Sequence, residues 1–95
     1  MTYRNRDLLS VVHEIDCVKC NRHGVQAAHS NLQEFGKGMG IKASDAAIMG
    51  ICPYCHSDLD QGKNMSKEER RVMQYECIAK TYVRLMELGL IQVAK

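Results

Sequence analysis

The sequence predicts a single small α+β domain over residues 1–95, and three observations carry this prediction. Two C-x2-C pairs, at residues 17–20 and 52–55, enclose two short apolar segments, 25–30 and 45–51. Segments of this length, separated by a polar and glycine-rich stretch, are typical of two strands of a β-hairpin. A capping-box sequence then opens a long amphipathic stretch, which is typical of a helix. We therefore expect a cysteine pair, a hairpin, a second cysteine pair with a short helix, and a long helix, in that order.

The part of the chain before and within the predicted hairpin gives weaker signals. Residues 8–15 are apolar enough for a strand or a short helix, and periodicity does not choose between them. Residues 21–24 are expected to turn, and residues 25–30 and 45–51 to pair as antiparallel strands. The intervening loop, 33–44, carries glycines at alternate positions. Its backbone N–H groups could approach a phosphate, although taken alone the loop is better explained as a plain flexible connector.

The cysteine pairs have the spacing of a structural zinc site. Zinc prefers four tetrahedral nitrogen or sulfur ligands, and each C-x2-C loop presents two sulfurs to one ion. We therefore expect Cys17, Cys20, Cys52 and Cys55 to bind one structural Zn²⁺, which would also compensate for a small core without tryptophan. The fifth cysteine, Cys77, is predicted to be a buried small hydrophobe. An odd number of cysteines without a signal-peptide pattern favours reduced, metal-bound thiols in a cytosol over secreted disulfides.

The second cysteine pair runs into a predicted short helix. Pro53 suits the first helical turn because its φ is fixed and it has no N–H to leave unpaired. Gly62 is expected to end this helix. His56 and Asp60 then stand at i and i+4 on one face. The neighbouring thiol of Cys55 points about 100° away, so it can face a buried zinc while His56 and Asp60 face a cleft.

The long helix is predicted from Ser66 to Leu88. Ser66 is its N-cap, Glu69 completes the capping box, and Gly89 stops it. One face of this helix gathers apolar residues, namely Val72, Tyr75, Ala79, Tyr82, Val83 and Met86. We expect this face to pack on the core, and the alternative is a homodimer formed through helix 66–88. Residues 90–93 form a short apolar tail, which could be an edge strand.

Charge and hydropathy limit the classes of function. No segment reaches the length of a transmembrane helix, and the first residues lack the apolar region of a signal peptide, so we expect a soluble intracellular protein. The net charge of +2 does not by itself indicate nucleic acid. Residues 17–44, however, carry Arg22, Lys37 and Lys42, together with Lys19, against Glu34 alone. This predicts a locally basic surface suited to a phosphate backbone, although ordinary solvated side chains account for these residues equally well.

The expected order of elements is that of a treble-clef zinc module with a histidine, His29, at the end of its first strand. Its motifs are Ala-Ala-His-Ser-Asn (27–31), Gly-Lys-Gly-Met-Gly-Ile-Lys-Ala-Ser-Asp (36–45) and Cys-x-x-Cys-His-x-x-x-Asp-Gln-Gly (52–62). With these motifs the sequence resembles the HNH, or ββα-metal (His-Me finger), nucleases, and most closely the small phage and prophage nucleases of the YbcO type. The likeness covers roughly residues 8–90 and depends on the order and spacing of the motifs.

This resemblance implies a metal-dependent endonuclease that hydrolyses DNA phosphodiester bonds in the cytoplasm of a bacterial host cell. His29 is the candidate general base, since an imidazole can take a proton from water at neutral pH. Asp45 or Asn31 is the candidate for orienting it. His56 and Asp60 are candidate ligands of a catalytic divalent cation such as Mg²⁺ or Mn²⁺. In the expected site, zinc fixes helix and hairpin so that His29 faces this second metal.

The sequence departs from the family pattern at two ligand positions, because many HNH enzymes have an acidic or histidine ligand at Ala28 and a histidine at Asp60. A non-catalytic zinc-finger-like module that binds DNA or a protein is the alternative. On that interpretation His29 is a strand-end residue without a catalytic role. His56 and Asp60 are then a helix-surface pair, or His56 replaces one thiol on zinc.

Overall fold

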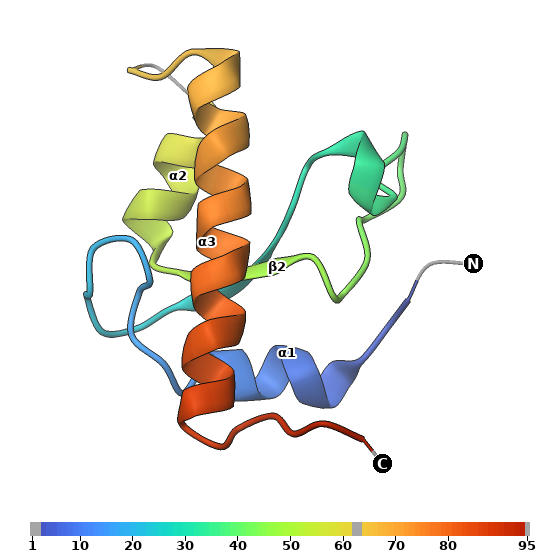
Figure 1. Ribbon diagram of the computed structural model, residues 1–95. Helices are drawn as coiled ribbons and strands as arrows, with labels where there is room; N and C mark the ends of the chain where they lie inside the picture. Colours follow the sequence, from blue (N-terminus) through green and yellow to red (C-terminus); the bar gives the residue numbers. More distant parts are fainter. Residues whose placement is uncertain (1–2, 62–63, 95) are drawn as a thin grey trace.

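The computed structural model describes residues 3–61 and 64–94, and within them it contains a two-stranded antiparallel hairpin and three α-helices. The predicted α+β class is therefore confirmed. In chain order the elements are α1 (Arg6–Val12), β1 (Gln26–His29), the 3-10 helix η1 (Gln33–Phe35), β2 (Ile48–Ile51), α2 (Pro53–Gln61) and α3 (Lys67–Glu87). In Figure 1, α3 crosses the hairpin, α2 lies beside the N-terminal half of α3, and α1 lies near its C-terminal end.

The predicted hairpin forms with the expected partners. Gln26 pairs with Ile51 at one end of the ladder, and His29 pairs with Ile48 at the other. The second strand begins at Ile48 rather than at residue 45, because the chain is still turning there and Ala47 N–H donates to the carbonyl of Ser44. All four residues of β2 are buried, so this strand is the centre of the domain.

The segment 8–15, for which the sequence allowed a strand or a helix, is helical as far as Val12, and this helix, α1, begins two residues earlier at Arg6. The side chain of Asn5 caps it by accepting a hydrogen bond from the N–H of Leu8 at 3.0 Å. Val12 and Ile15 at its end pack against the hairpin at Gly50. A methyl group on Gly50 would lie only 2.8 Å from Ile15 Cδ1, so a glycine is needed for this close approach.

Helix α3 begins as predicted, with Ser66 and Glu69 forming both hydrogen bonds of the capping box. The face of α3 that packs on the core is, however, not the predicted one. Its buried residues are Met73, Gln74, Cys77, Thr81 and Leu85. Apolar residues of the predicted packing face are exposed, namely Val72, Tyr75, Val83 and Met86. The polar Thr81 occupies the contact because its Oγ1 accepts a hydrogen bond from the N–H of Gly50 at 2.9 Å and donates to the carbonyl of Cys77.

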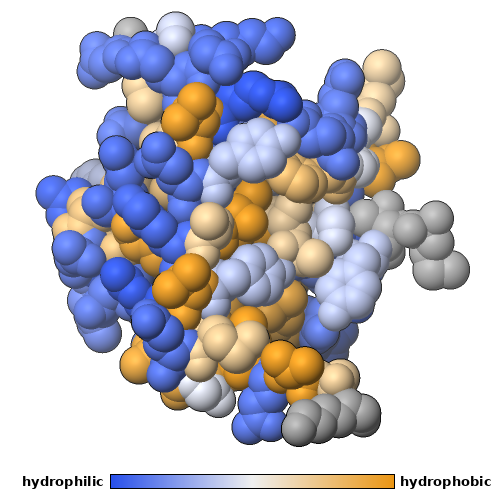
Figure 2. Space-filling model, in the orientation of Figure 1, coloured by the Kyte–Doolittle hydropathy of each residue, from blue (hydrophilic) through white to orange (hydrophobic). Residues whose placement is uncertain are grey.

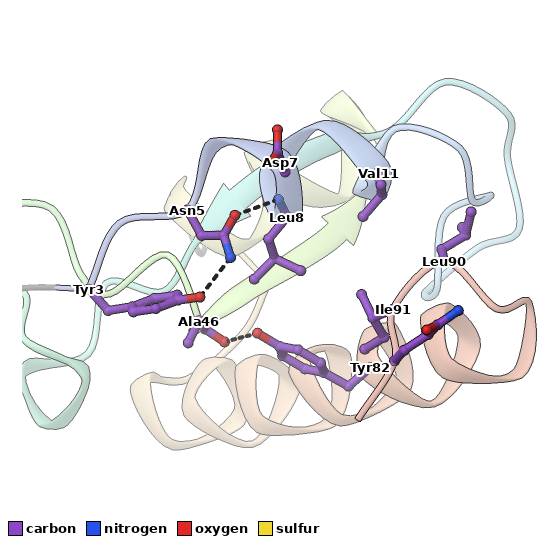
Figure 3. Close-up of a pocket in the computed structure, with 10 residues that line it drawn as sticks. Tyr3, Asn5, Asp7, Leu8, Val11, Ala46, Tyr82, Leu90 and Ile91 are labelled. Atoms are coloured by element: carbon purple, nitrogen blue, oxygen red, sulfur yellow. Dashed lines mark hydrogen bonds between the residues drawn. The ribbon is translucent and has the colours of Figure 1, made fainter. Parts of the chain in front are cut away.

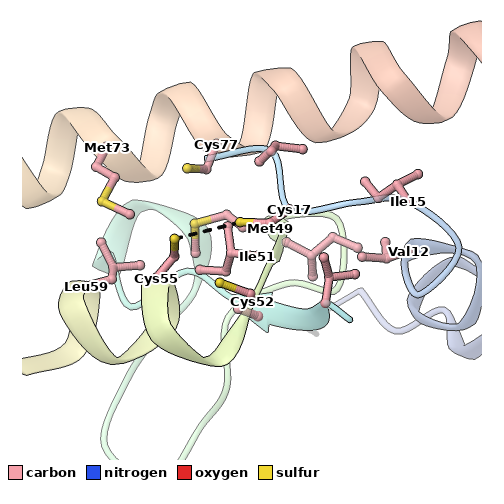
Figure 4. Close-up of a cluster of buried hydrophobic side chains, with 14 of the residues drawn as sticks. Val12, Ile15, Cys17, Met49, Ile51, Cys52, Cys55, Leu59, Met73 and Cys77 are labelled. Atoms are coloured by element: carbon pink, nitrogen blue, oxygen red, sulfur yellow. Dashed lines mark hydrogen bonds between the residues drawn. The ribbon is translucent and has the colours of Figure 1, made fainter. Parts of the chain in front are cut away.

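The hydrophobic core lies between α3 and the hairpin and continues into the cysteine pairs (Figure 4). Its largest fully buried apolar side chains are Val12, Ile48, Met49, Ile51, Leu59 and Leu85. Cys77 is buried here, as predicted, and is only 2% exposed. The outer edge of β2 is also covered, because the N–H of Val18 donates to the carbonyl of Gly50 at 3.0 Å.

The C-terminal tail turns at Gly89, whose φ is +73°, and then runs along α1 and α3. The prediction of an edge strand at residues 90–93 is wrong, since no strand forms there. Leu90 and Ile91 instead pack on the core and line a cavity of about 510 Å³, which Figure 3 shows between the two ends of the described chain. The predicted stop at Gly62 lies outside the described residues. Across residues 3–61 and 64–94, none of the helices combines the length and hydropathy needed to cross a membrane.

Candidate metal centre and histidine pairs

The four predicted zinc ligands come together in one cluster. Cys17 and Cys20 lie on the loop after α1, Cys52 follows β2 directly, and Cys55 is in the first turn of α2. The loop turns sharply after Cys20, where Asn21 has a φ of +66° and donates its N–H to the carbonyl of Cys17 at 2.8 Å. This turn brings both sulfurs of the first pair toward the second pair.

The distances within the cluster fit a tetrahedral zinc site. The Sγ atoms of Cys17 and Cys55 are 3.7 Å apart, those of Cys20 and Cys52 are 3.5 Å apart, and all four lie within 4.8 Å of one another. With a Zn–S bond of about 2.3 Å, two sulfurs of a tetrahedron are about 3.8 Å apart. The four cysteines could therefore hold one zinc ion without rearrangement.

The electrostatics of the cluster favour a thiolate at Cys52. Burial acts to raise the pKa of Cys52, but the backbone N–H of Cys55 and the neighbouring thiols lower it from 9.0 to about 6. Burial and the other thiols raise the pKa of Cys55 instead, as expected where four thiols crowd without a cation between them. Zinc binds the deprotonated thiol, so the cluster is ready to exchange its protons for a metal.

Arg22, one of the predicted nucleic-acid-binding residues, lies beside this cluster. Its guanidinium stands over the ring of Tyr54 at 4.8 Å from the centroid, and the thiols of Cys52 and Cys20 raise its pKa. This position makes it a neighbour of the cysteine cluster.

The candidate base His29 is paired with the buried carboxylate of Asp45. His29 Nε2 lies 2.6 Å from Asp45 Oδ1. Two further groups hold this carboxylate, because Arg4 Nη1 donates to Oδ1 at 3.2 Å and the N–H of Asn5 donates to Oδ2 at 2.7 Å. Burial acts to raise the pKa of Asp45, but these hydrogen bonds outweigh it and lower that pKa. Asp45 is therefore an ionised acceptor, and the proton of the neutral imidazole belongs on Nε2.

This tautomer leaves Nδ1 of His29 as a proton acceptor. The side chain is 20% exposed, which gives water access to it, while Asp45 is only 6% exposed. A carboxylate that fixes the orientation and tautomer of a partly exposed imidazole is the arrangement needed by a general base. Asn31, the other candidate for orienting His29, instead accepts a hydrogen bond on Oδ1 from Gln74 Nε2 at 2.6 Å.

His56 and Asp60 form the predicted i,i+4 pair on α2, with 3.3 Å between Nε2 and Oδ2. The other ring nitrogen, Nδ1, lies 2.8 Å from the amide oxygen of Gln26. If Nδ1 donates its proton to this oxygen, the Nε2 lone pair and the Asp60 carboxylate point at the same place. A histidine that ligates a metal through one nitrogen usually donates a hydrogen bond through the other, so the pair could supply two ligands to a cation.

Strand alternation places His29 on the α1 side of the hairpin. Ala27 pairs with Gly50, and the open side of Gly50 faces Ile15 and Val12 at the end of α1. Because successive side chains alternate between the two faces of a strand, His29 lies on the same face as Ala27. This agrees with its contact to Asp45, which the segment before α1 holds.

His56 and Asp60 lie on the other face. Their partner Gln26 precedes Ala27 by one residue, so it points to the opposite side from His29. Gln26 and His29 are also about 10 Å apart along the strand. The structure thus does not bring His29 together with the His56–Asp60 pair. In the described part of the chain, the cysteine cluster is the one group of three or more metal-ligating side chains.

The remaining predicted phosphate contacts lie in the loop between β1 and β2. Lys37 and Lys42 are exposed, and the carbonyl of Lys42 accepts from Arg4 Nη2 at 3.1 Å, which places Lys42 on the side of the Asp45 pair. The loop's N–H groups are partly used within the loop itself, since Gly36 donates to Gln33 and Gly38 donates to Ile41.

Sequence reasoning missed three residues that build these sites. Asn5 could have been found, because an asparagine just before an apolar helical run is a typical N-cap. Arg4 and Gln26 act across 41 and 30 residues of sequence, and no local pattern signals such contacts.

Comparison with known proteins found none that is significantly similar to this chain. No protein-family model matches the sequence, and neither the curated proteins nor the solved structures contain a significant match. What the chain can do must therefore be argued from its motifs and from the geometry above.

Proposed function

We propose that the protein is a metal-dependent DNA endonuclease of HNH type, built on a treble-clef module with a structural zinc held by four cysteines. The observation that carries the proposal is the pair of His29 and Asp45, in which a buried carboxylate fixes a partly exposed imidazole. In this proposal Nδ1 of His29 takes the proton of the attacking water. The resemblance of the sequence motifs to those of phage and prophage nucleases supports DNA as the substrate and the cytoplasm of a bacterial host cell as the location.

His56 and Asp60 are the side chains that would hold the catalytic cation, with Gln26 orienting the imidazole. Bound there, Mg²⁺ or another divalent ion would neutralise charge on a phosphate. This pair lies on the opposite face of the hairpin from His29, so the two parts of the proposal must be tested separately.

A plasmid-nicking assay tests the base. Purified zinc-loaded protein is incubated with supercoiled DNA in EDTA, Mg²⁺, Mn²⁺ or Ni²⁺. We expect metal-dependent nicking that falls about 100-fold or more in His29→Ala, because a positioned general base contributes roughly that much. The matched control is His23→Ala, since His23 is 97% exposed and belongs to neither pair. Equal nicking by both variants would remove His29 from the mechanism.

The cation site is tested by Asp60→Asn together with His56→Ala. If this pair holds the catalytic cation, both variants raise the metal concentration needed for half-maximal nicking and leave the zinc content at one per chain. An unchanged metal requirement in both variants would exclude these ligands.

A second function is favoured by the separation of His29 from the His56–Asp60 pair. It is that of a non-catalytic zinc module that binds DNA or a protein. Its signature is salt-sensitive DNA binding that is indifferent to Mg²⁺ and to loss of Asp60, with no cleavage under any metal. The nicking assay and this binding assay together decide between the two functions.

We also propose that the outer apolar face of α3, of which Val72, Tyr75 and Met86 are exposed and Tyr82 is partly buried, pairs with a second copy of the chain. Val72, Tyr75, Ala79, Tyr82 and Met86 follow one another at alternating spacings of three and four residues, the pattern of a coiled-coil seam. Figure 2 shows apolar side chains along this face with hydrophilic side chains beside them. Sedimentation equilibrium should give a dimer for the wild type and a monomer for Val72→Glu with Met86→Glu. A monomeric wild type would overturn this proposal.

A further inference from the structure

A groove lies between the segment that follows β1 and the first turns of α3. Its cavity of about 720 Å³ is lined by residues 31–34 on one side and by α3 side chains from Lys67 to Gln74 on the other. In Figure 1 these are the upper part of α3 and the chain leading into η1. Neither the cysteine cluster nor either histidine pair contributes a residue to it.

Arg70 lines this groove with an unsatisfied donor. Among the described residues, its Nε is the one buried side-chain nitrogen or oxygen that has no hydrogen-bond partner. Leaving a buried donor of a charged group unpaired is costly, so such groups in native structures usually have a partner, which can be an ion or a ligand. Because this nitrogen is buried, the Arg70 side chain would have to turn toward the groove for an acceptor oxygen there to supply that partner.

The charges of the groove favour an anion. Three cationic and two acidic side chains line it, and one acid is already neutralised. Arg71 Nη1 donates to Glu34 Oε1 at 3.0 Å, and Tyr75 donates to the same carboxylate. Arg71 first, and then Tyr75, lower the pKa of Glu34 to about 2. Within the described part of the chain, Lys67 and Arg70 therefore face the groove without an ion pair, against Glu68 alone.

The wall of the groove is held rigidly by Gln74, which is 2% exposed. Its Oε1 accepts hydrogen bonds from Ser30 Oγ at 2.7 Å and from the N–H of Asn31 at 3.1 Å, while its Nε2 donates to Asn31. This network ties the end of β1 to α3. Because the wall is fixed in advance, a ligand does not have to order it on binding.

We propose that this groove binds a phosphate group, with the guanidinium of Arg70 as the principal donor and Lys67 as the second charge. A planar guanidinium can present two donors to two phosphate oxygens. The phosphate can belong to a nucleic-acid backbone or be free in solution, and the chemistry is the same. Asn31 lies two residues beyond His29, so the groove begins within about 7 Å of the backbone of His29. Phosphate binding in this groove does not depend on whether His29 cleaves DNA.

The test compares Arg70→Gln with Lys80→Gln in the zinc-loaded protein. Lys80 is exposed on the same helix outside the groove, so its variant controls for the loss of one positive charge. Binding of a short single-stranded DNA oligonucleotide is followed by anisotropy at several salt concentrations, and binding of inorganic phosphate by calorimetry. We expect Arg70→Gln to lower the affinity for the probe that binds by about tenfold or more. For the oligonucleotide, the slope of log affinity against log salt should shrink by about 0.7, and Lys80→Gln should leave both values unchanged.

The two probes distinguish the source of the phosphate. Loss of oligonucleotide affinity in Arg70→Gln identifies a backbone phosphate, whereas loss of inorganic phosphate binding alone identifies a free anion, and either result supports the site. Equal effects of Arg70→Gln and Lys80→Gln, or no effect of either, would overturn it. Arg70→Gln removes an unpaired donor and should not lower the melting temperature. If it does, the same comparison is made with Lys67→Gln, and the same outcomes support or overturn the phosphate site.

Discussion

Removal of zinc should unfold most or all of the domain. At about 0.05–0.15 kcal/mol per residue, a chain of 95 residues has a free energy of unfolding of roughly 5–14 kcal/mol. A structural zinc site contributes an apparent 10–16 kcal/mol at about pH 7, which is comparable to that whole amount. The cysteine cluster also joins the loop after α1 to β2 and α2, so its loss would separate three parts of the core. We expect a chelator to abolish the cooperative thermal transition.

The assay is a thermal melt followed by circular dichroism, with zinc measured in parallel. Cys52→Ser should lose its zinc and melt like the chelated wild type. Cys77→Ala is the matched control, since Cys77 is buried but lies outside the cluster, and it should keep one zinc per chain at a cost of about 1 kcal/mol. A chelated protein that melts at the temperature of the zinc-loaded one would refute the reasoning, as would full zinc occupancy in Cys52→Ser.

Acid should release the metal. The pKa of Cys52 is depressed from 9.0 to about 6, against the effect of burial, by the backbone N–H of Cys55 and the neighbouring thiols. An acidic group with a lowered folded-state pKa stabilises the fold fully above its unfolded pKa, and this stabilisation is lost as the pH falls through the folded value. Zinc competes with protons for all four thiols, and burial and the neighbouring thiols raise the pKa of Cys55, so zinc affinity should fall as the pH is lowered, in step with proton uptake. A dye that reports free zinc during acid titration measures this directly.

Three further predictions concern the scaffold. Burial acts to raise the pKa of Asp45, but the hydrogen bond with His29 is the chief cause of its being lowered. This carboxylate should therefore stabilise the fold above about pH 4 and lose its effect on further acidification. Asp45→Asn should remove that part of the pH dependence of the free energy of unfolding. Gly50→Ala should cost about 1–3 kcal/mol, because its methyl group overlaps Ile15, and an unchanged denaturation midpoint would contradict the packing described. Ser66→Ala should cost about 1 kcal/mol through loss of the α3 N-cap, while Ser66→Asp, which keeps an acceptor, should cost less.

Local patterns in the sequence predicted those features that depend on local physics. Cysteine spacing predicted the cluster, Pro53 the start of α2, and Ser66 with Glu69 the start of α3. The packing face of α3 could not be predicted in the same way. Its contact depends on Thr81, a polar residue that an apolar pattern excludes, and on a backbone N–H of β2 that satisfies it.

The sequence predicted individual residues of the candidate site but not how they lie relative to one another. Strand alternation alone turns Gln26 and His29 to opposite faces, but no motif indicates that Gln26 is the residue that contacts His56. Asp45 was one of two candidates for orienting His29, and the choice is decided by Arg4 and the backbone of Asn5, which hold its carboxylate across about 40 residues of chain.

Because of where the cysteine cluster lies, zinc binding would require the native register of the hairpin. Cys52 follows β2 immediately, and Val18, next to Cys17, hydrogen-bonds to Gly50 within that strand. A slip of one residue in the hairpin would turn every side chain of β2 to the other face and carry Cys52 away from its partners. Only the native pairing presents four sulfurs to one ion, so zinc would select it from among the pairings that short, glycine-interrupted strands can form. Addition of zinc to the unfolded, metal-free protein should therefore produce this single hairpin register.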